Sequence, residues 1–276
     1  MRLRSLLFVP GDRPERFAKA AASGADAIIL DLEDSVVAAA KPAAREAVGR
    51  YLASPADGVL RFVRINPPTE GLLDADLAVA RAADGVMLPK AEGAQDVASL
   101  AAALAPRPLP ILPVATETPA AVFALGGYRT VADRLAGLTW GAEDLPAAIG
   151  AVSAREADGR YTSPYEMVRS LALFGAHAAG VAAIETVFPA IRDEAGLAAY
   201  AARGARDGFT GMMAIHPAQV AAINAAFTPS AEQLAAARAI LDAFVANPGA
   251  GALQVDGRMV DAPHLKQAQA LLARAG

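Results

Sequence analysis

The chain has 276 residues, a length typical of one (β/α)8 barrel and long for most other single domains. Its net charge of −4 argues against general nucleic-acid binding, and the absence of cysteine excludes disulfides, thiolate catalysis and cysteine-bound zinc. No apolar run is long enough to span a membrane, and the short run after the basic start is not a signal-peptide core. We therefore expect a soluble cytoplasmic protein.

Short apolar runs typical of buried strands alternate with segments of helical periodicity. The strand-like runs cover residues 3–9, 27–32, 60–65, 85–89, 111–115, 135–140, 183–188 and 211–215. The helical segments cover residues 15–22, 36–51, 72–82, 94–104, 120–125, 165–179, 194–205 and 217–227. This alternation predicts an α/β protein with a parallel sheet, and eight such units favour a closed TIM barrel. A doubly wound open sheet is the alternative, although no G-x-G-x-x-G fingerprint follows the first strand.

The pattern changes after residue 227. Ser230 is a plausible N-cap of a long helix that runs to about Val245, and a flexible linker follows at 247–251. Asp256-Gly257 is a strong hairpin signal, and a short helix is expected after Pro263. We divide the chain into a barrel domain, 1–227, and a C-terminal segment, 228–276, that is too small for a core of its own.

Glu117 and Asp144 follow the fifth and sixth predicted strands. A strand–helix–strand unit places neighbouring parallel strands with their carboxyl ends on the same side, so the two carboxylates are expected to face one another. Oxygen ligands without nearby nitrogen or sulfur favour a hard cation such as Mg²⁺. The alternative is that each carboxylate only caps the helix after its strand.

Other charged residues lie at the predicted strand ends. Arg64 ends an apolar strand on the face of Phe62, and it either forms a structural ion pair or grips a substrate carboxylate in a bidentate way. The two interpretations of Arg64 are compatible. In a structural ion pair, the acidic partners of Arg64 would come from the cluster of Asp31, Glu33 and Asp34. Lys90 is a second candidate to neutralise that cluster. The individual roles of the three carboxylates and of Lys90 stay open.

The remaining basic residues carry weaker signals. Arg13, Arg16 and Lys19 follow the first strand and form either a solvated helix face or a site for the phosphates of a large substrate. His216 precedes Pro217 at a helix start, where a structural hydrogen bond is expected. The chain has three histidines without ligand spacing, which argues against a histidine-bound metal.

An ordered set of motifs resembles the citrate lyase beta-subunit family within the HpcH/HpaI aldolase superfamily, which includes malyl-CoA and citramalyl-CoA lyases. The motifs are LFVPGDRPERF at 7–17, LDLEDSV at 30–36 with Lys41 and Arg45 beyond, RIN at 64–66, LPK at 88–90, ETP at 117–119, GAEDL at 141–145 and HPAQV at 216–220. The resemblance covers essentially the whole chain. It departs from the simple aldolases at Asp34, where those enzymes have a histidine, so a histidine base is not available there.

The resemblance implies a TIM barrel that assembles as a homotrimer or hexamer. It also implies Mg²⁺ held by Glu117 and Asp144, a 2-oxo acid carboxylate held by Arg64, and contact of Glu117 with substrate. The tail resembles the lid of stand-alone CoA lyases, whose Asp completes a neighbouring subunit's site, and Met259-Val260-Asp261 fits that pattern. The alternative for Asp261 is a cap before the helix that Pro263 opens.

From these observations we expect an oxo-acid-lyase that cleaves a citryl-like acyl thioester to an oxaloacetate-like 2-oxo acid and an acetyl thioester. Arg64 and Asp261 are the expected catalytic residues, Arg64, Glu117 and Lys19 bind substrate, and Glu117 and Asp144 bind Mg²⁺. The thioester is carried either by an acyl carrier protein, as in a citrate lyase complex, or by CoA, as in a malyl-CoA or citramalyl-CoA lyase or a malate synthase-type enzyme. A non-catalytic ligand-binding or assembly subunit is the third alternative, and no nucleic-acid or membrane partner is expected.

Overall fold

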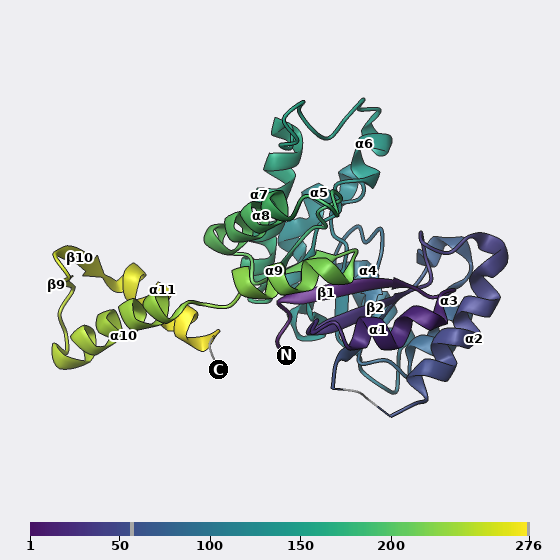
Figure 1. Ribbon diagram of the computed structural model, residues 1–276, viewed down its shortest axis with the longest axis horizontal. Helices are drawn as coiled ribbons and strands as arrows, with labels where there is room; N and C mark the ends of the chain where they lie inside the picture. The colour runs from purple at the N-terminus through teal and green to yellow at the C-terminus, as the bar shows by residue number, and fades with distance from the viewer. Residues whose placement is uncertain (56–57, 275–276) are drawn as a thin grey trace. The chain divides into compact units, whose positions relative to one another are not determined.

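The computed structural model describes residues 1–55 and 58–274 (Figure 1). The chain falls into two compact units, Met1–Asn224 and Ala225–Gly276. The first unit contains an eight-stranded sheet, and the second contains a two-stranded hairpin together with helices. The first unit therefore carries the sheet predicted from the alternating apolar runs.

The strands of the sheet are β1 (Ser5–Pro10), β2 (Ala27–Asp31), β3 (Leu60–Arg64), β4 (Gly85–Leu88), β5 (Ile111–Pro113), β6 (Gly137–Thr139), β7 (Ala182–Glu185) and β8 (Gly211–Ala214). They pair in parallel in the order β5-β4-β3-β2-β1-β8-β7-β6. Backbone N–H groups of Ala115 and Ala136 donate to Thr139 and Ile111 at 2.9 and 2.8 Å, which joins β5 to β6. This closure confirms the barrel and sets aside the open, doubly wound sheet.

Helices connect successive strands of the barrel, as the sequence predicts. The α-helices are α1 (Phe17–Ala21), α2 (Lys41–Leu52), α3 (Leu73–Ala80), α4 (Ala94–Ala103), α5 (Pro119–Ala124), α6 (Asp144–Ile149), α7 (Ser163–Ala179), α8 (Glu194–Asp207) and α9 (Val220–Ala226). Short 3-10 segments are η1 (Pro14–Arg16), η2 (Ala38–Ala40), η3 (Pro68–Glu70), η4 (Leu125–Arg134) and η5 (Pro217–Gln219). Within the described part of the chain, every helix is too short or too polar to cross a lipid bilayer.

Side chains alternate between the barrel interior and the surrounding helices. Ile29, Phe62 and Met213 belong to one buried apolar cluster in the interior. Asp31 and Arg64 each lie two residues further along their strands, so they share the inward face. The predicted placement of Arg64 on the face of Phe62 is confirmed, since Arg64 lines a cavity at the carboxyl ends of the strands.

The helix predicted for 36–51 begins only at Lys41. Pro42 has no N–H group and fits the first turn of a helix, where that group has no intrahelical partner. The carboxylate of Asp31 accepts the backbone N–H of Ser35 at 3.1 Å and holds the preceding residues in a turn. The chain therefore stays close to the end of β2 before α2 starts.

One helix was not predicted. Helix α6 begins at Asp144 and ends at Ile149, and its C-cap Gly150 has a φ of 69°, the left-handed conformation that commonly terminates helices. An irregular segment follows, with an antiparallel bridge between Arg155 and Tyr161, before α7 starts. The sequence pattern predicts no helix between the sixth strand and the helix at 165–179, so this insertion is a difference between prediction and structure.

The second unit contains α10 (Ala231–Ala246), β9 (Ala252–Val255), β10 (Arg258–Asp261) and α11 (Ala262–Ala273). Ser230 caps α10 as predicted, and the Asp256-Gly257 turn joins the hairpin with φ angles of 47° and 76°. Helices α10 and α11 pack on each other (Figure 1). Few of its described residues are buried, namely Phe227, Ala237, Val260 and Ala268.

Candidate active site

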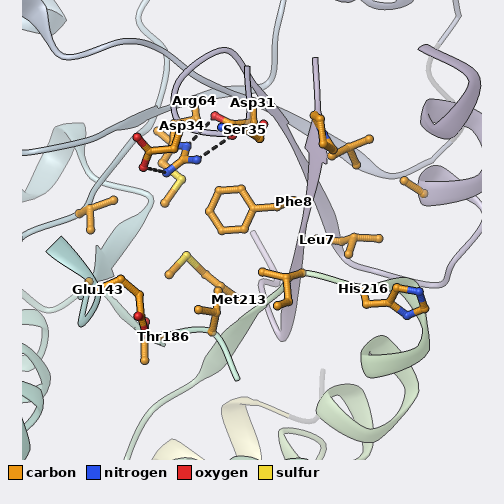
Figure 2. A pocket seen from close by; sticks show the side chains of 18 of the residues that line it. Leu7, Phe8, Asp31, Asp34, Ser35, Arg64, Glu143, Thr186, Met213 and His216 are labelled. Carbon is orange, nitrogen blue, oxygen red and sulfur yellow. Dashed lines mark hydrogen bonds and ion pairs between the residues drawn. The ribbon is translucent and has the colours of Figure 1, made fainter. Parts of the chain in front are cut away.

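A cavity of about 800 Å³ lies at the carboxyl ends of the barrel strands (Figure 2). Residues of every strand, or of the segment that directly follows it, line the cavity. Barrel enzymes place their active sites at this end, so the cavity is the candidate site. Its charged lining residues are Arg16, Lys19, Asp31, Asp34, Arg64, Glu117, Glu143 and Asp144.

Arg64 faces the cavity and is held by the acidic residues after β2, as Figure 2 shows. Its Nε and Nη2 donate to the two carboxylate oxygens of Asp31 at 2.6 and 2.7 Å. Its Nη1 lies 2.9 Å from Glu33 and 3.6 Å from Asp34, and its guanidinium carbon is 4.8 Å from the ring centroid of Phe8. The structural ion pair is therefore present, and the same side chain also borders the space that a ligand would fill.

Lys90 connects the carboxylates of the site. Its ammonium nitrogen lies 3.0 Å from Glu33 and 3.8 Å from Asp144, and its backbone N–H donates to Glu117 at 2.5 Å. Its φ of 51° falls in the left-handed region, which is uncommon for a residue with a side chain. Burial raises the pKa of Glu33 to about 7, although the charge of Arg64 opposes this rise. Lys90 thus neutralises the acidic cluster, a role that the sequence had left open.

Glu117 is buried in the cavity wall after β5. Burial raises the pKa of Glu117 to about 8, and the negative charges of Asp144 and Glu33 add to the rise, although the N–H of Lys90 opposes it. Ionising this carboxyl beside other carboxylates is costly in the absence of a cation. The environment of Glu117 is therefore one that a bound cation would relieve.

Asp144 lies at the start of α6, just after β6, and its side chain is 36% exposed. It lines the same cavity as Glu117, so both carboxylates lie at the carboxyl end of the barrel strands. Among residues 1–55 and 58–274, no group of three or more His, Cys, Asp or Glu side chains has the geometry of a metal site. Two protein carboxylates with room for water and ligand oxygens suit Mg²⁺, which keeps several waters in its shell. The residues present fit this ion.

A buried polar network behind the cavity was not predicted. The ammonium group of Lys41 donates to the carbonyl oxygen of Leu32 at 2.9 Å and also contacts Asn66. Asp76 accepts the backbone N–H of Asn66 at 2.7 Å and Nε of Arg45 at 2.7 Å. These contacts fix the residues that follow β2 and β3. Lys41 and Arg45 lie one turn apart on α2, a spacing that places both side chains on one face of the helix and is the signal that the sequence carried.

Three weaker candidates also line the cavity. Lys19 and Arg16 reach it from the segment after β1. His216 lines it as well, and its Nδ1 accepts the backbone N–H of Ala218 at 3.2 Å, which is the expected structural hydrogen bond. The site thus has basic side chains at one part of its lining, where a phosphate group of a large substrate could bind.

Asp261 belongs to the second unit, where it lies at the end of β10 and is the N-cap of α11. Its carboxylate contacts Nδ1 of His264, and the hydrogen bond from His264 lowers the pKa of Asp261. The cap that the sequence offered as an alternative is therefore present. The catalytic role of Asp261 stays a prediction.

Residues 4–217, which include every residue that lines the cavity, match the sequence profile of one known family. The chain belongs to the HpcH/HpaI aldolase/citrate lyase family. Within this family, the chain is 42% identical over 272 residues to a citrate lyase subunit beta-like protein of Mycobacterium tuberculosis. That alignment covers 98% of this chain and 94% of the relative.

Solved structures of this family have the same fold. The CitE protein of Mycobacterium tuberculosis, crystallised with magnesium, acetoacetate and coenzyme A, matches with a TM-score of 0.81 at 41% identity. The match covers 100% of this chain and 98% of that chain. The citrate lyase beta subunit of the same organism, complexed with oxaloacetate and magnesium, matches with a TM-score of 0.72 at 40% identity, over 83% of this chain and 98% of that chain.

Proposed function

We propose that the protein is a Mg²⁺-dependent oxo-acid-lyase that cleaves a citryl-like acyl thioester into an oxaloacetate-like 2-oxo acid and an acetyl thioester. The observation that carries the proposal is the convergence of Glu117, Asp144 and Arg64 on one cavity at the carboxyl end of the barrel. The relatives crystallised with magnesium, with oxaloacetate and with coenzyme A support the same reaction class.

Glu117 and Asp144 are the proposed Mg²⁺ ligands, because both offer carboxylate oxygens to the cavity. Bound Mg²⁺ supplies Lewis-acid stabilisation of negative charge on the substrate oxygen at the bond that breaks. Arg64 holds the substrate carboxylate, which fixes the bond to be cleaved relative to that oxygen. Nε and Nη2 of Arg64 already bind Asp31, and Nη1 lies 2.9 Å from Glu33, so the substrate must bind at the N–H groups of Nη1 and Nη2 that these contacts leave.

The cleavage is a retro-Claisen reaction. The hydroxyl group of the substrate gives its proton to a water molecule, the carbon–carbon bond breaks, and the electron pair of that bond stays on the α-carbon of the acetyl thioester, which then takes up a proton. Asp261 of a neighbouring subunit is the proposed acid that protonates this carbon. Lys19, which lines the cavity near its basic side, is proposed to bind the phosphates of the carrier.

A second candidate function is that of a stand-alone enzyme that takes a CoA thioester. Coenzyme A in the crystal structure of the CitE relative favours a stand-alone lyase of malyl-CoA or citramalyl-CoA type, or a malate synthase-type enzyme, over a subunit that takes its thioester from an acyl carrier protein. For either function we propose a cytoplasmic homotrimer or hexamer, on the basis of the family resemblance and the tail at 228–276.

The test is a screen of the purified protein with Mg²⁺ against citryl-CoA, malyl-CoA and citramalyl-CoA. We expect cleavage of at least one thioester, loss of cleavage on addition of a metal chelator, and recovery when Mg²⁺ is restored. Glu117→Ala should be inactive and should bind neither Mg²⁺ nor oxaloacetate in calorimetry, while keeping its fold. Glu46→Ala, which removes an exposed carboxylate on α2, is the matched control and should behave as the unaltered chain. Unchanged Mg²⁺ and oxaloacetate binding by Glu117→Ala would refute the proposed metal site.

A further inference from the structure

Glu185 is a fully buried carboxylate at the end of β7 that does not line the cavity. Its oxygens accept hydrogen bonds from Nε1 of Trp140 at 2.6 Å, Nε of Arg169 at 2.7 Å and the hydroxyl of Tyr200 at 3.0 Å. A carboxylate in this position is expensive to bury, and these three side-chain donors, together with the backbone N–H of Thr186 at 3.0 Å, compensate for the loss of water. The proposed reaction leaves this group without a role.

The hydrogen bond to Trp140 leads toward the proposed metal site. Trp140 is fully buried directly after β6, and the next residue, Gly141, lines the cavity. The backbone N–H of Gly141 donates to the hydroxyl of Thr116 at 3.0 Å, and that hydroxyl donates to the Gly141 carbonyl at 3.1 Å. Thr116 is the residue before Glu117, so two hydrogen bonds tie the strand end that carries Glu117 to the strand end that carries Asp144.

The backbone at Gly141 packs closely against the residues at the end of β5. A Cβ atom placed on Gly141 would lie 2.8 Å from Cγ of Glu117 and 3.1 Å from a methyl group of Val114. The backbone at Gly141 is therefore in van der Waals contact with the side chain of Glu117. A shift of the residues after β6 toward Glu117 is therefore expected to displace its side chain, because densely packed interiors transmit displacements.

We infer that Glu185 is a positioning residue for Glu117, acting through Trp140, Gly141 and Thr116. This inference rests on the proposed function, since it concerns the geometry of the proposed ligand pair. The hydrogen bond from Trp140 to Glu185 holds the indole in place, and the buried indole holds the residues after β6. The hydrogen bonds between Gly141 and Thr116 then fix the end of β5 relative to these residues. The carboxylates of Glu117 and Asp144 then keep one separation before any ion binds.

The test measures binding of Mn²⁺, used as a paramagnetic probe in place of Mg²⁺, to the full-length protein by electron paramagnetic resonance. Glu185→Gln keeps the shape of the side chain but replaces one acceptor oxygen by a donor. Thr116→Val is nearly isosteric and removes both hydrogen bonds to Gly141. Tyr200→Phe is the matched control, because it removes a hydrogen bond to the same carboxylate without touching β5 or β6. Thermal unfolding of each variant is recorded alongside.

Glu185→Gln and Thr116→Val are each expected to weaken Mn²⁺ binding about tenfold or more, as loss of groups that orient metal ligands commonly does. Tyr200→Phe should leave the dissociation constant within about twofold. Because the two residues act along one chain of contacts, the double variant should bind about as weakly as the weaker single variant. If Glu185→Gln does not fold, Thr116→Val alone still tests the final link.

Two results overturn the inference by itself. In the first, folded Thr116→Val and Glu185→Gln proteins bind Mn²⁺ with unaltered affinity although their melting temperatures have fallen. The hydrogen-bond network then contributes to stability only. The other is a fully additive loss in the double variant, which contradicts a shared route through Trp140. Absence of Mn²⁺ binding by the unaltered chain overturns the proposed function and this inference together.

Discussion

A single side chain, Arg64, combines structural and proposed functional roles. Its guanidinium is nearly buried, binds both oxygens of Asp31 and still borders the cavity. Burial raises the pKa of Asp31, but the hydrogen bonds and charge of Arg64 outweigh it and hold that pKa below its ordinary value. The planar fork of arginine suits this bidentate geometry, whereas a lysine ammonium is a point charge. The position therefore requires the shape of arginine as well as its charge.

Arg64→Lys is expected to lower kcat/KM about 30-fold or more, which corresponds to about 2 kcal/mol of lost transition-state binding, the scale of a charge-assisted hydrogen bond. Steady-state kinetics with the thioester identified in the screen measures this effect. Arg50→Lys on the exposed face of α2 is the control and should leave the rate unchanged. A near-normal rate in Arg64→Lys would mean that the residue serves only as the partner of Asp31.

A second ion pair lies at the opposite end of the first strands. Nε and Nη2 of Arg4 donate to Asp26 at 2.9 and 2.7 Å, and the backbone N–H of Arg4 donates to it at 2.8 Å. Burial raises the pKa of Asp26, but the hydrogen bonds and charge of Arg4 outweigh burial and lower the pKa below its ordinary value. Because the pKa of Asp26 is lower in the folded than in the unfolded protein, the ionised carboxylate stabilises the fold at pH values above its ordinary pKa. This stabilisation is lost as the pH falls through the folded-state pKa.

Asp26→Asn should therefore lower the free energy of unfolding by about 1–2 kcal/mol at pH 7, a figure reduced for partial solvent exposure. The difference between the variant and the unaltered protein should narrow from about pH 5 downward, as Asp26 becomes protonated. Urea unfolding at pH 7, 5 and 4 measures this trend. If the difference in the free energy of unfolding between the two proteins stays constant over these pH values, the charge of Asp26 is not the source of the stabilisation.

At the scale of elements, closure of the barrel depends on close approach of strand backbones. A Cβ atom on Gly211 would lie 1.8 Å from the carbonyl oxygen of Leu3, beside the pairing of β8 with β1. No side chain fits there unless the strands separate. Because β1 and β8 both carry residues of the cavity, a small residue at this position helps to set the dimensions of the site.

Gly211→Ala is expected to lower the free energy of unfolding by about 2–3 kcal/mol, the upper part of the range for overpacking a dense interior. Gly126→Ala is the matched control, since a Cβ there meets nothing within 4 Å, and it should change stability by less than about 0.5 kcal/mol. Chemical denaturation of both variants gives the comparison. Equal effects at the two positions would mean that strand spacing adapts freely.

At the scale of the whole molecule, the first unit carries the cavity and the second carries Asp261. The described part of the second unit buries few residues. The family resemblance implies that the tail completes the site of another subunit. Two differently damaged chains should then be able to complement one another.

Asp261→Asn and Glu117→Ala proteins are each expected to be inactive, the first without the proton-transfer group and the second without a metal ligand. Mixing them under conditions that exchange subunits should restore activity, because some sites then combine an intact Glu117 with an intact Asp261 from another chain. Steady-state assays of verified mixed oligomers measure the recovery. If the mixed oligomers stay inactive, the C-terminal segment completes the site of its own chain. If Asp261→Asn protein is fully active, Asp261 serves only as a helix cap.

The sequence by itself determined the parallel α/β sheet, because near-continuous apolar runs at eight places are typical of strands covered on both faces, and it favoured the barrel over an open sheet. It also placed Glu117, Asp144 and Arg64 at strand ends, since the side-chain period of a strand is two and parallel strands share one carboxyl end. The Asp-Gly hairpin and the Ser230 cap followed from local backbone chemistry. These features depend on residues close together in the chain.

Only the tertiary structure decided which charges meet. Lys90 joins Glu33, Asp144 and Glu117 because the ends of β4, β2, β6 and β5 converge in space, and no spacing along the chain encodes that convergence. The buried acceptor Glu185 was missed for the same reason. A buried carboxylate inside an apolar strand resembles any other interruption of the pattern until its three side-chain donors, from distant elements, are seen around it.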